Sequence, residues 1–298
     1  MAKKMTMADI ASLSGVGKST VSRYFNGGYV KDETRAKIQK VIEEYNYTPN
    51  AFARLNAKQS NVIGVVVPTL NSKITSRVIT SIDRYLREKG YTTLIQNSDH
   101  NIDQELQNIQ RLIQLNVDGI LISSIAITKD HKELLKKAGI PVVVLTQDYE
   151  DGISIIYDDY HAGKAMGEHI GKKGHQKVGY IGVYETDKAV GTERRNGVLD
   201  GLKEYGITPV IGKSDYSFLG GQMVARELLE KEPDLDAIIC ATDRLAFGTY
   251  KILHEYKKEI PEEVSVAAFG GYDESALLTP ELTTLKFDSY GMGYLGAE

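Results

Sequence analysis

The sequence has little of what a secreted or membrane protein needs. It contains one cysteine, Cys240, so no disulfide can form within the chain. Its purely apolar runs are short, such as IGVVV at 63–67, whereas a membrane span needs about 20 residues. The first residues, MAKKMTMADIASLSG, are basic, but no apolar block of the signal-peptide type follows them. We therefore expect a protein of the cytoplasm that is not embedded in a membrane.

Signatures of catalysis and of metal binding are also scarce. The six histidines are scattered without the spacing of metal ligands, and no Ser/His/Asp pattern or G-x-S-x-G motif occurs. GKS at 17–19 has the look of a phosphate-binding loop, but Ser12 stands where that loop requires glycine. The adjacent carboxylates Asp158 and Asp159 have no companion phosphate loop, which argues against a kinase or phosphatase. We expect no enzymatic activity, no cofactor and no metal.

What the chain does have is an uneven distribution of charge. Its length of 298 residues suggests two domains, or two and a small module, and its net charge is −4. Residues 1–60 carry ten Lys and Arg against five Asp and Glu, a net charge of +5, while residues 61–298 carry a net charge of −9. This asymmetry is typical of a nucleic-acid-binding module attached to a sensing or catalytic body, although a chance fluctuation in charge would look the same.

The basic N-terminal segment has the pattern of a helix-turn-helix. In TMADIASLSGVGKSTVSRYFNGG the apolar residues recur at helical spacing around a break at Ser14-Gly15. Thr6 lies three residues before Asp9, as in a capping box, and the glycine pair 27–28 ends the second helix. A third helix fits DETRAKIQKVIEEYNY, with Asp32 at its N-cap. In this motif the second helix enters the DNA major groove.

The second predicted helix begins near Lys18 and exposes residue types that suit DNA. Arginine can pair with guanine through two hydrogen bonds, hydroxyls contact bases and phosphates, and lysine adds positive charge. An ordinary polar helix face is the alternative interpretation. The residues that this helix would present are Lys18, Ser19, Ser22 and Arg23, with Tyr24 close by.

The rest of the chain alternates apolar runs with amphipathic stretches. VIGVVVP, YTTLIQNS and VDGILISS read as strands separated by helices, and the same rhythm restarts after Tyr157. Continuous Val and Ile runs indicate strands that are covered on both faces, hence parallel sheets flanked by helices. Two doubly wound halves result, and a ligand would bind in the cleft between them, beyond the carboxyl ends of the strands.

Polar residues follow several of these strands and would converge on that cleft. Carboxylates, amides and a guanidinium suit a polyhydroxylated ligand, because each hydroxyl can both donate and accept a hydrogen bond. A sugar or sugar phosphate fits best. The tyrosines and phenylalanine at 184, 218 and 272 could stack on a sugar ring, and residues 157–159 could belong to the site or to the crossover. The residues that follow strands or open the next helix are Asn71, Ser72, Gln147, Asp148, Arg194, Asp243 and Asp273.

Together these segments resemble one family. TMADIASLSGVGKSTVSRYFNG, VKDETRAKIQKVIEEYNYTPNAFAR, IGVVVPTL, GHQKVGYIG, ERRNGVLDGL, CATDRLAFG and AFGGYDESALLTPELTTL are similar to the LacI/GalR family of bacterial transcription repressors over nearly the whole chain. The resemblance implies an all-α helix-turn-helix head plus an α/β body like a periplasmic binding protein, made of two doubly wound parallel-sheet subdomains. It also implies a homodimer that binds double-stranded, pseudo-palindromic operator DNA under the control of an effector.

The resemblance also assigns domains and roles. We expect a DNA-binding domain at 1–48, a hinge at 49–60 and an effector-binding and dimerisation domain at 61–298. Its N-subdomain would span about 61–158 plus 290–298, and its C-subdomain about 159–289. The family's R-x-x-G element maps to Arg194, its "ND" element to Thr242 and Asp243, with threonine in place of the common asparagine, and its later aspartate to Asp273. The implied DNA-binding set is Thr6, Lys18, Ser19, Thr20, Ser22, Arg23, Asn26, Asn50, Arg54 and Leu55.

Two segments depart from the family pattern. The hinge leucine that would wedge into the minor groove is Leu55, two residues after Ala53 where the family has three, and one residue rotates a helix by about 100°. Arg54 and Lys58 would contact phosphates, and a plain flexible linker is the alternative for this segment. The family also continues beyond the point that matches GMGYLGAE, so we expect this sequence to end inside a helix of the body.

The function that follows is a repressor of a carbohydrate-utilisation operon. Sucrose is the preferred effector, with trehalose and fructose as alternatives, and an inducer and a corepressor are both open. A phosphoprotein corepressor is a further alternative, and a sugar-binding protein without DNA-binding activity is another. We expect Arg23→Ala to abolish operator binding but spare effector binding, and Arg194→Ala to do the reverse.

Overall fold

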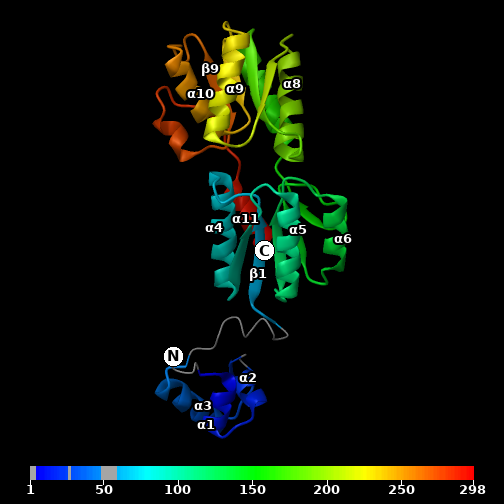
Figure 1. Ribbon diagram of the computed structural model, residues 1–298, viewed down its shortest axis with the longest axis vertical. Helices are drawn as coiled ribbons and strands as arrows, with labels where there is room; N and C mark the ends of the chain where they lie inside the picture. Colours follow the sequence, from blue (N-terminus) through cyan, green and yellow to red (C-terminus); the bar gives the residue numbers. More distant parts are fainter. Residues whose placement is uncertain (1–4, 26–27, 48–58) are drawn as a thin grey trace. The chain divides into compact units, whose positions relative to one another are not determined.

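The computed structural model describes residues 5–25, 28–47 and 59–298. The chain folds as two compact units, Met1–Ser60 and Asn61–Glu298, which we call the head and the body. Figure 1 colours them along the sequence, with the head in dark blue. Each unit has its own hydrophobic core, so each is described by itself.

The head contains helices α1 (Met7–Ser14), α2 (Lys18–Phe25) and α3 (Asp32–Glu44). Thr6 and Asp9 form the predicted capping box at the start of α1, and Gly15 ends that helix in the left-handed conformation at φ 65°. The amide of Gly28 donates to the carbonyl of Arg23, which closes the end of α2. The predicted cap at Asp32 is wrong, because Lys31 occupies the N-cap position and Asp32 lies in the first turn.

The core of the head fixes how its helices pack. Ile10, Val21 and Ile38 are fully buried, one from each helix. Each of these residues belongs to the apolar face of its helix, so each amphipathic helix buries that face in the core. The opposite faces of the helices therefore remain at the surface, which is where the polar residues of α2 lie.

The body has two lobes, each with a five-stranded parallel sheet flanked by helices (Figure 1). The strand order is β2-β1-β3-β4-β5 in the first lobe and β10-β9-β8-β6-β7 in the second. The first lobe comprises β1 (Val62–Val67), α4 (Lys73–Glu88), β2 (Thr92–Asn97), α5 (Ile102–Gln114), β3 (Gly119–Ser123), α6 (Lys129–Lys137), β4 (Val142–Leu145), β5 (Ile153–Ile155) and α11 (Ser289–Ala297). The second comprises α7 (Asp159–Lys172), β6 (Val178–Val183), a π-helical segment η2 (Lys188–Arg194), α8 (Arg195–Lys203), β7 (Val210–Ser214), α9 (Phe218–Lys231), β8 (Ala237–Cys240), α10 (Asp243–Glu255), β9 (Ser265–Phe269), η3 (Asp273–Leu277) and β10 (Thr283–Leu285).

The apolar run of β1 explains the layering of the first lobe. Val65 and Val67 pack on one face of the sheet against α4 and α11, while Val66 packs on the other face with residues of α5. Side chains of a strand alternate between faces, so a continuous valine run needs helices on both sides. Figure 1 shows α4 and α11 on one side of this sheet and α5 and α6 on the other. The predicted fold class is confirmed.

The segment before Arg194 differs from the prediction that this residue opens a helix. Lys188–Arg194 forms a π-helical segment that continues directly into α8, and the side chain of Asp187 accepts a hydrogen bond from the amide of Val190 at its start. Arg194 is therefore the last residue of this segment rather than the first of an α-helix. A π-helical turn re-aims the side chains around it, and such turns often occur at functional sites.

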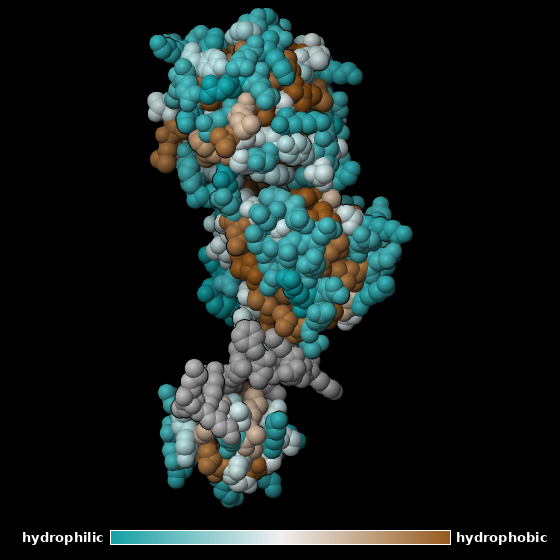
Figure 2. Space-filling view, viewed as in Figure 1, coloured by the Kyte–Doolittle hydropathy of each residue, from teal (hydrophilic) through white to brown (hydrophobic). Residues whose placement is uncertain are grey.

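Figure 2 shows that the face of the body seen in that view is mostly hydrophilic, with narrower hydrophobic strips between. This is the surface expected where amphipathic helices cover the sheets and turn their polar faces to water. Among the described residues, no helix is long and apolar enough to cross a membrane.

Candidate functional site

The surface of α2 presents the chemistry of DNA recognition in the head. Lys18, Ser19 and Arg23 are exposed, Thr20 and Ser22 are partly exposed, and Val21 is buried beneath them. The predicted polar and buried faces of this helix are thus the ones observed. Asn26, Asn50, Arg54 and Leu55, which were also predicted to contact DNA, lie outside the described residues.

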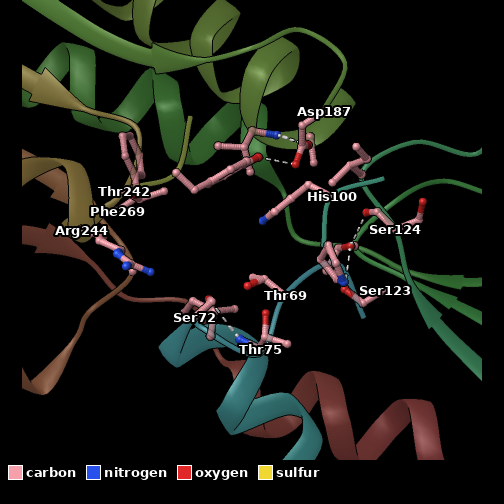
Figure 3. Close-up of a pocket in the computed structure, with 18 of the residues that line it drawn as sticks. Thr69, Ser72, Thr75, His100, Ser123, Ser124, Asp187, Thr242, Arg244 and Phe269 are labelled. Atoms are coloured by element: carbon pink, nitrogen blue, oxygen red, sulfur yellow. Dashed lines mark hydrogen bonds between the residues drawn. The ribbon is translucent and has the colours of Figure 1, made fainter. Parts of the chain in front are cut away.

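The body contains a cavity of about 510 Å³ between its two lobes. Residues of both lobes line it, and most follow the carboxyl ends of strands, as the fold predicts. Figure 3 shows Thr69, Ser72 and Thr75 on one side of the space and Thr242, Arg244 and Phe269 on another, with His100 and Asp187 opposite. This volume lies within the range of sites for small ligands.

A buried ion pair forms one wall of the cavity. The Nε of Arg194 donates to the Oδ1 of Asp159 at 2.8 Å, one terminal nitrogen donates to the same oxygen, and the other donates to the carbonyl of Ala241 at 2.6 Å. The rings of Phe269 and Phe287 lie 5.0 and 4.9 Å from the guanidinium carbon. Burial disfavours the charge of Arg194, but the charge of Asp159 and its hydrogen bonds more than compensate, so the pKa of Arg194 is raised.

The opposite wall is built around Asp187. This carboxylate accepts hydrogen bonds from the hydroxyl of Tyr216, from the amide of Val190 at 3.0 Å and from the Nε2 of Gln147 at 3.2 Å. Burial raises its pKa, while these hydrogen bonds act in the other direction. Because Gln147 belongs to the first lobe and Asp187 to the second, this group also joins the lobes.

His100 stacks on Tyr216 beside this wall. The ring centroids are 4.9 Å apart and the planes are 9° from parallel. The Nδ1 of His100 is buried and has no hydrogen-bond partner among the described residues. Burial lowers the pKa of His100, and the nearby carboxylates of Asp187, Asp99 and Asp215 offset this only in part. The imidazole is therefore neutral at pH 7, and it is a second contact between the lobes.

Further contacts between the lobes lie along the other side of the cavity. Arg77 on α4 donates to the carbonyl of Gly271 at 2.9 Å and to Asp273 at 3.1 Å. Arg244 on α10 donates to the carbonyl of Asn71 at 2.8 Å. The lobes are thus held by polar contacts on both sides of the cavity, and a ligand that bridges them would act on the same geometry.

Comparisons with known proteins agree with both sites. Residues 6–50 match the family described as bacterial regulatory proteins, lacI family, and residues 60–295 match the periplasmic binding proteins and sugar binding domain of the LacI family. The chain belongs to the LacI family. A "Sucrose operon repressor" of Staphylococcus xylosus is 33% identical over 95% of this chain and 88% of its own length. A "Ribose operon repressor" of Halalkalibacterium halodurans is 29% identical over 97% of this chain and 87% of its own length.

Solved structures carry the same fold. The lac repressor dimer bound to operator and an anti-inducer superposes with a TM-score of 0.86 over 99% of this chain and 91% of that chain, at 24% identity. A LacI family regulator from Enterococcus faecium with bound ribose has a TM-score of 0.72 over 79% of this chain and 87% of that chain, at 28% identity.

In this LacI-family body, five of the eight predicted effector-binding residues line the cavity. Asn71, Ser72, Gln147 and Thr242 come from loops or helix starts at the carboxyl ends of strands, as predicted, whereas Arg194 comes from the end of the π-helical segment. Tyr184 and Tyr272, suggested for ring stacking, also line the cavity, as do Tyr157 and Asp159, whereas Phe218 and Asp158 do not. The five are Asn71, Ser72, Gln147, Arg194 and Thr242.

The other three predicted residues lie outside the cavity lining. Asp148 is exposed and accepts a hydrogen bond from Ser154 at 3.3 Å. Asp273 is 86% exposed at its side chain and pairs with Arg77. Asp243 is fully buried, and its carboxylate holds neighbouring loops of the second lobe together. These residues were predicted near the cleft because they follow strands, but each side chain contacts another group and does not line the cavity.

Several cavity residues were missed from the sequence. Asp99 and His100 follow β2, Ser123 ends β3 and Ser124 follows it, and Asp187 follows β6. The same strand-end rule could have found all of them. Within the described residues, no group of three or more His, Cys, Asp or Glu side chains is arranged to hold a metal ion.

Proposed function

We propose that this LacI-family protein represses a carbohydrate-utilisation operon and that a small sugar bound in the cavity controls its affinity for a pseudo-palindromic operator. The observation that carries the proposal is the cavity between two lobes, lined by hydroxyl-bearing side chains of both, in a chain that also presents an exposed Lys18, Ser19 and Arg23 on the second helix of a helix-turn-helix. The protein would act as a homodimer, with one head on each half-site.

The proposed control is thermodynamic linkage. A ligand shifts an equilibrium between two body arrangements only by the difference in its affinity for them. The contacts between Gln147 and Asp187 and between Arg244 and Asn71 define one such arrangement. A sugar that hydrogen-bonds to both lobes would favour it over an arrangement with the lobes apart. The sugar therefore needs no contact with DNA.

Sucrose is our preferred effector, in part because a relative that covers most of this chain is named a sucrose operon repressor. A thermal-shift panel of sugars on the full-length protein tests this, since only a ligand that binds the folded state raises the melting temperature. We expect sucrose to raise it more than ribose or trehalose at equal concentration. An unchanged melting temperature with every sugar of the panel would contradict sugar control.

The DNA-binding part of the proposal needs its own test. Selection of duplexes from a random pool by the full-length protein should enrich inverted repeats with half-sites about 10 base pairs apart, centre to centre. Arg23→Ala should remove the enrichment, because this exposed arginine is placed to reach base edges. The matched control is Arg226→Ala, in a surface ion pair of the body. Recovery of random duplexes by the unaltered chain would contradict the proposal.

A further inference from the structure

The charged side chains that line the cavity bear on whether it binds neutral or anionic sugars. Its described lining holds two arginines, Arg194 and Arg244, against four carboxylates, Asp99, Asp159, Asp187 and Asp215. A sugar phosphate or a sugar acid would need a surplus of positive charge or of free donors. The lining instead has more acidic than basic side chains. Whether an anionic sugar can bind therefore depends on whether Arg194 or Arg244 has charge and N–H donors that are not already paired.

Arg194 has no charge to offer a second anion. Asp159 neutralises it through two of its nitrogens, and the carbonyl of Ala241 takes a third. The rings of Phe269 and Phe287 cover its faces. A phosphate on the ligand would have to displace Asp159 and leave that buried carboxylate without its partner, which is strongly unfavourable. Hydroxyl oxygens can instead accept from the remaining N–H groups without breaking the pair.

The wall around His100 is negative. Asp99, Asp187 and Asp215 line the cavity with His100, and their charges act to raise its pKa, although burial acts more strongly to lower it. The charge of Arg194 acts to lower the pKa of Asp187, but that guanidinium is paired with Asp159, and no cation of the described lining forms an ion pair with Asp99, Asp187 or Asp215. Each carboxylate that is not paired with a cation therefore disfavours an anionic ligand, most strongly where little salt or water screens the charge.

The helix N-termini that meet the cavity already carry side-chain caps. Ser72, Ser217 and Thr242 are the N-caps of α4, α9 and α10, and each accepts a hydrogen bond from an amide of its own first turn. An anion would have to compete with these caps for the amides. Arg244 is then the remaining cation, and one of its nitrogens is already bound to the carbonyl of Asn71.

We propose that this cavity selects a neutral polyhydroxylated sugar and rejects the phosphorylated or carboxylated form of the same sugar. The inference rests on the proposed function, because it specifies the ligand of that site. The hydroxyls of Thr69 and Thr75 face the space together with the imidazole of His100 (Figure 3). Each hydroxyl can donate one hydrogen bond and accept two, which matches neutral sugar hydroxyls and requires no charge.

Isothermal titration of the full-length protein with matched pairs of ligands tests the inference. The pairs are sucrose with sucrose 6-phosphate, and glucose with glucose 6-phosphate and gluconate. We expect each anionic member to bind about tenfold more weakly than its neutral parent, or worse, and the difference to shrink as salt is added. An anionic member that binds as tightly as its parent overturns the inference.

Charge-removing variants show whether the cavity carboxylates cause the discrimination. In the double variant Asp99→Asn, Asp215→Asn, the ratio of the neutral and anionic affinities should fall several-fold, because two exposed carboxylates beside His100 lose their charge. The matched control is Glu227→Gln on the exposed face of α9, which should keep the ratio of the unaltered protein. An equal ratio in all three proteins overturns the inference.

The outcomes also separate this inference from the proposed function. Tight binding of a phosphorylated sugar that alters operator affinity would overturn the inference and leave sugar control in place. Binding of neutral sucrose without any change in operator affinity would support the inference and contradict the proposed control. Failure of every neutral and anionic ligand to bind would overturn both.

Discussion

At the scale of single residues, Asp243 has a structural role at the edge of the cavity. Its carboxylate accepts hydrogen bonds from the amide of Tyr272 at 2.7 Å, from the hydroxyl of Ser275 at 3.0 Å and from the hydroxyl of Thr284. Burial raises its pKa, whereas these three donors act to lower it. The side chain thereby fixes the loop that carries Tyr272 into the cavity lining.

Asp243→Asn should lower the free energy of unfolding by about 1–3 kcal/mol. The side-chain NH2 of asparagine is a donor, and it would face the donors that now bind the carboxylate oxygens. At least one buried polar group would then lack a partner. Chemical denaturation measures the loss. The matched control is Asp273→Asn, whose side chain is 86% exposed and should cost much less. Equal losses in the two variants would contradict the role given to Asp243.

His100 should make stability depend on pH. Its folded pKa lies below the usual 6.5, so the unfolded chain binds more protons at this residue below that pH, and stability falls as the pH is lowered. His100→Asn removes this contribution, and the loss of stability between about pH 7 and pH 5 should become shallower. Denaturation at a series of pH values measures it. His169→Asn, on the exposed side of α7, is the control, and an equal change there would count against the assignment.

At the scale of elements, α7 and α8 approach each other through glycines. A Cβ at Gly197 would collide with the carbonyl oxygen of Tyr160, and one at Gly163 would collide with the carbonyl oxygen of Arg194. The same holds for Gly201 against Lys164. Because α8 continues from the π-helical segment that ends at Arg194, this close packing also helps to set the position of that arginine.

Gly197→Ala should therefore destabilise the body by about 1–3 kcal/mol, although alanine favours a helix more than glycine does. The added methyl group would occupy space that backbone atoms of α7 already fill, so α7 and α8 would have to move apart. Thermal unfolding measures the effect. The neighbouring substitution Asn196→Ala introduces no buried atom and serves as control. A Gly197→Ala protein as stable as the control would show that the helices are less closely packed.

Most elements could be predicted because their signal is local. The apolar runs of β1, β3 and β8 and the capping box of Thr6 depend on neighbours in sequence, and all were predicted. The π-helical segment was not, because it depends on Asp187 and on packing against α7. The partners of Asp243 and Asp273 could not be predicted either, since they come from distant parts of the sequence. Sequence periodicity indicates which loops meet at the sheet edge, but not which side chains turn into the cavity.

At the scale of the whole body, polar contacts across the cavity set the separation of the lobes. Arg77 has a side chain that is 9% exposed and reaches Gly271 and Asp273 of the other lobe. Lys73 pairs with Glu274 nearby at 2.8 Å, and the two side chains are 48% and 41% exposed. A buried guanidinium contributes more to such an interface than an exposed ion pair does.

Arg77→Gln should weaken the binding of a sugar that bridges the lobes by about 2- to 12-fold, which corresponds to about 0.5–1.5 kcal/mol for the lost hydrogen bonding. The lobes would spend less time at the separation that the sugar requires. Titration calorimetry measures the affinity. The control is Arg226→Gln, whose ion pair with Glu255 lies within the second lobe. Equal sugar affinity in both variants would contradict the role of Arg77.

The structure also indicates a better variant than Arg194→Ala for testing whether operator binding and effector response depend on separate residues. Arg194→Ala would leave the buried Asp159 without its partner, so loss of sugar response in that variant could reflect partial unfolding. Asn71→Ala is a cleaner cavity variant, because the described contacts of Asn71 use its backbone. We expect it to bind operator normally and to respond less to sugar.

We propose above all that a sugar bound in the cavity changes the affinity of the head for operator DNA. The most direct measurement is the dissociation constant of the selected operator at fixed salt, by fluorescence anisotropy, with and without saturating sucrose. We predict a change of about 5- to 150-fold in the full-length protein and a smaller change in Asn71→Ala. The same dissociation constant with and without a sugar that calorimetry shows to be bound would contradict it.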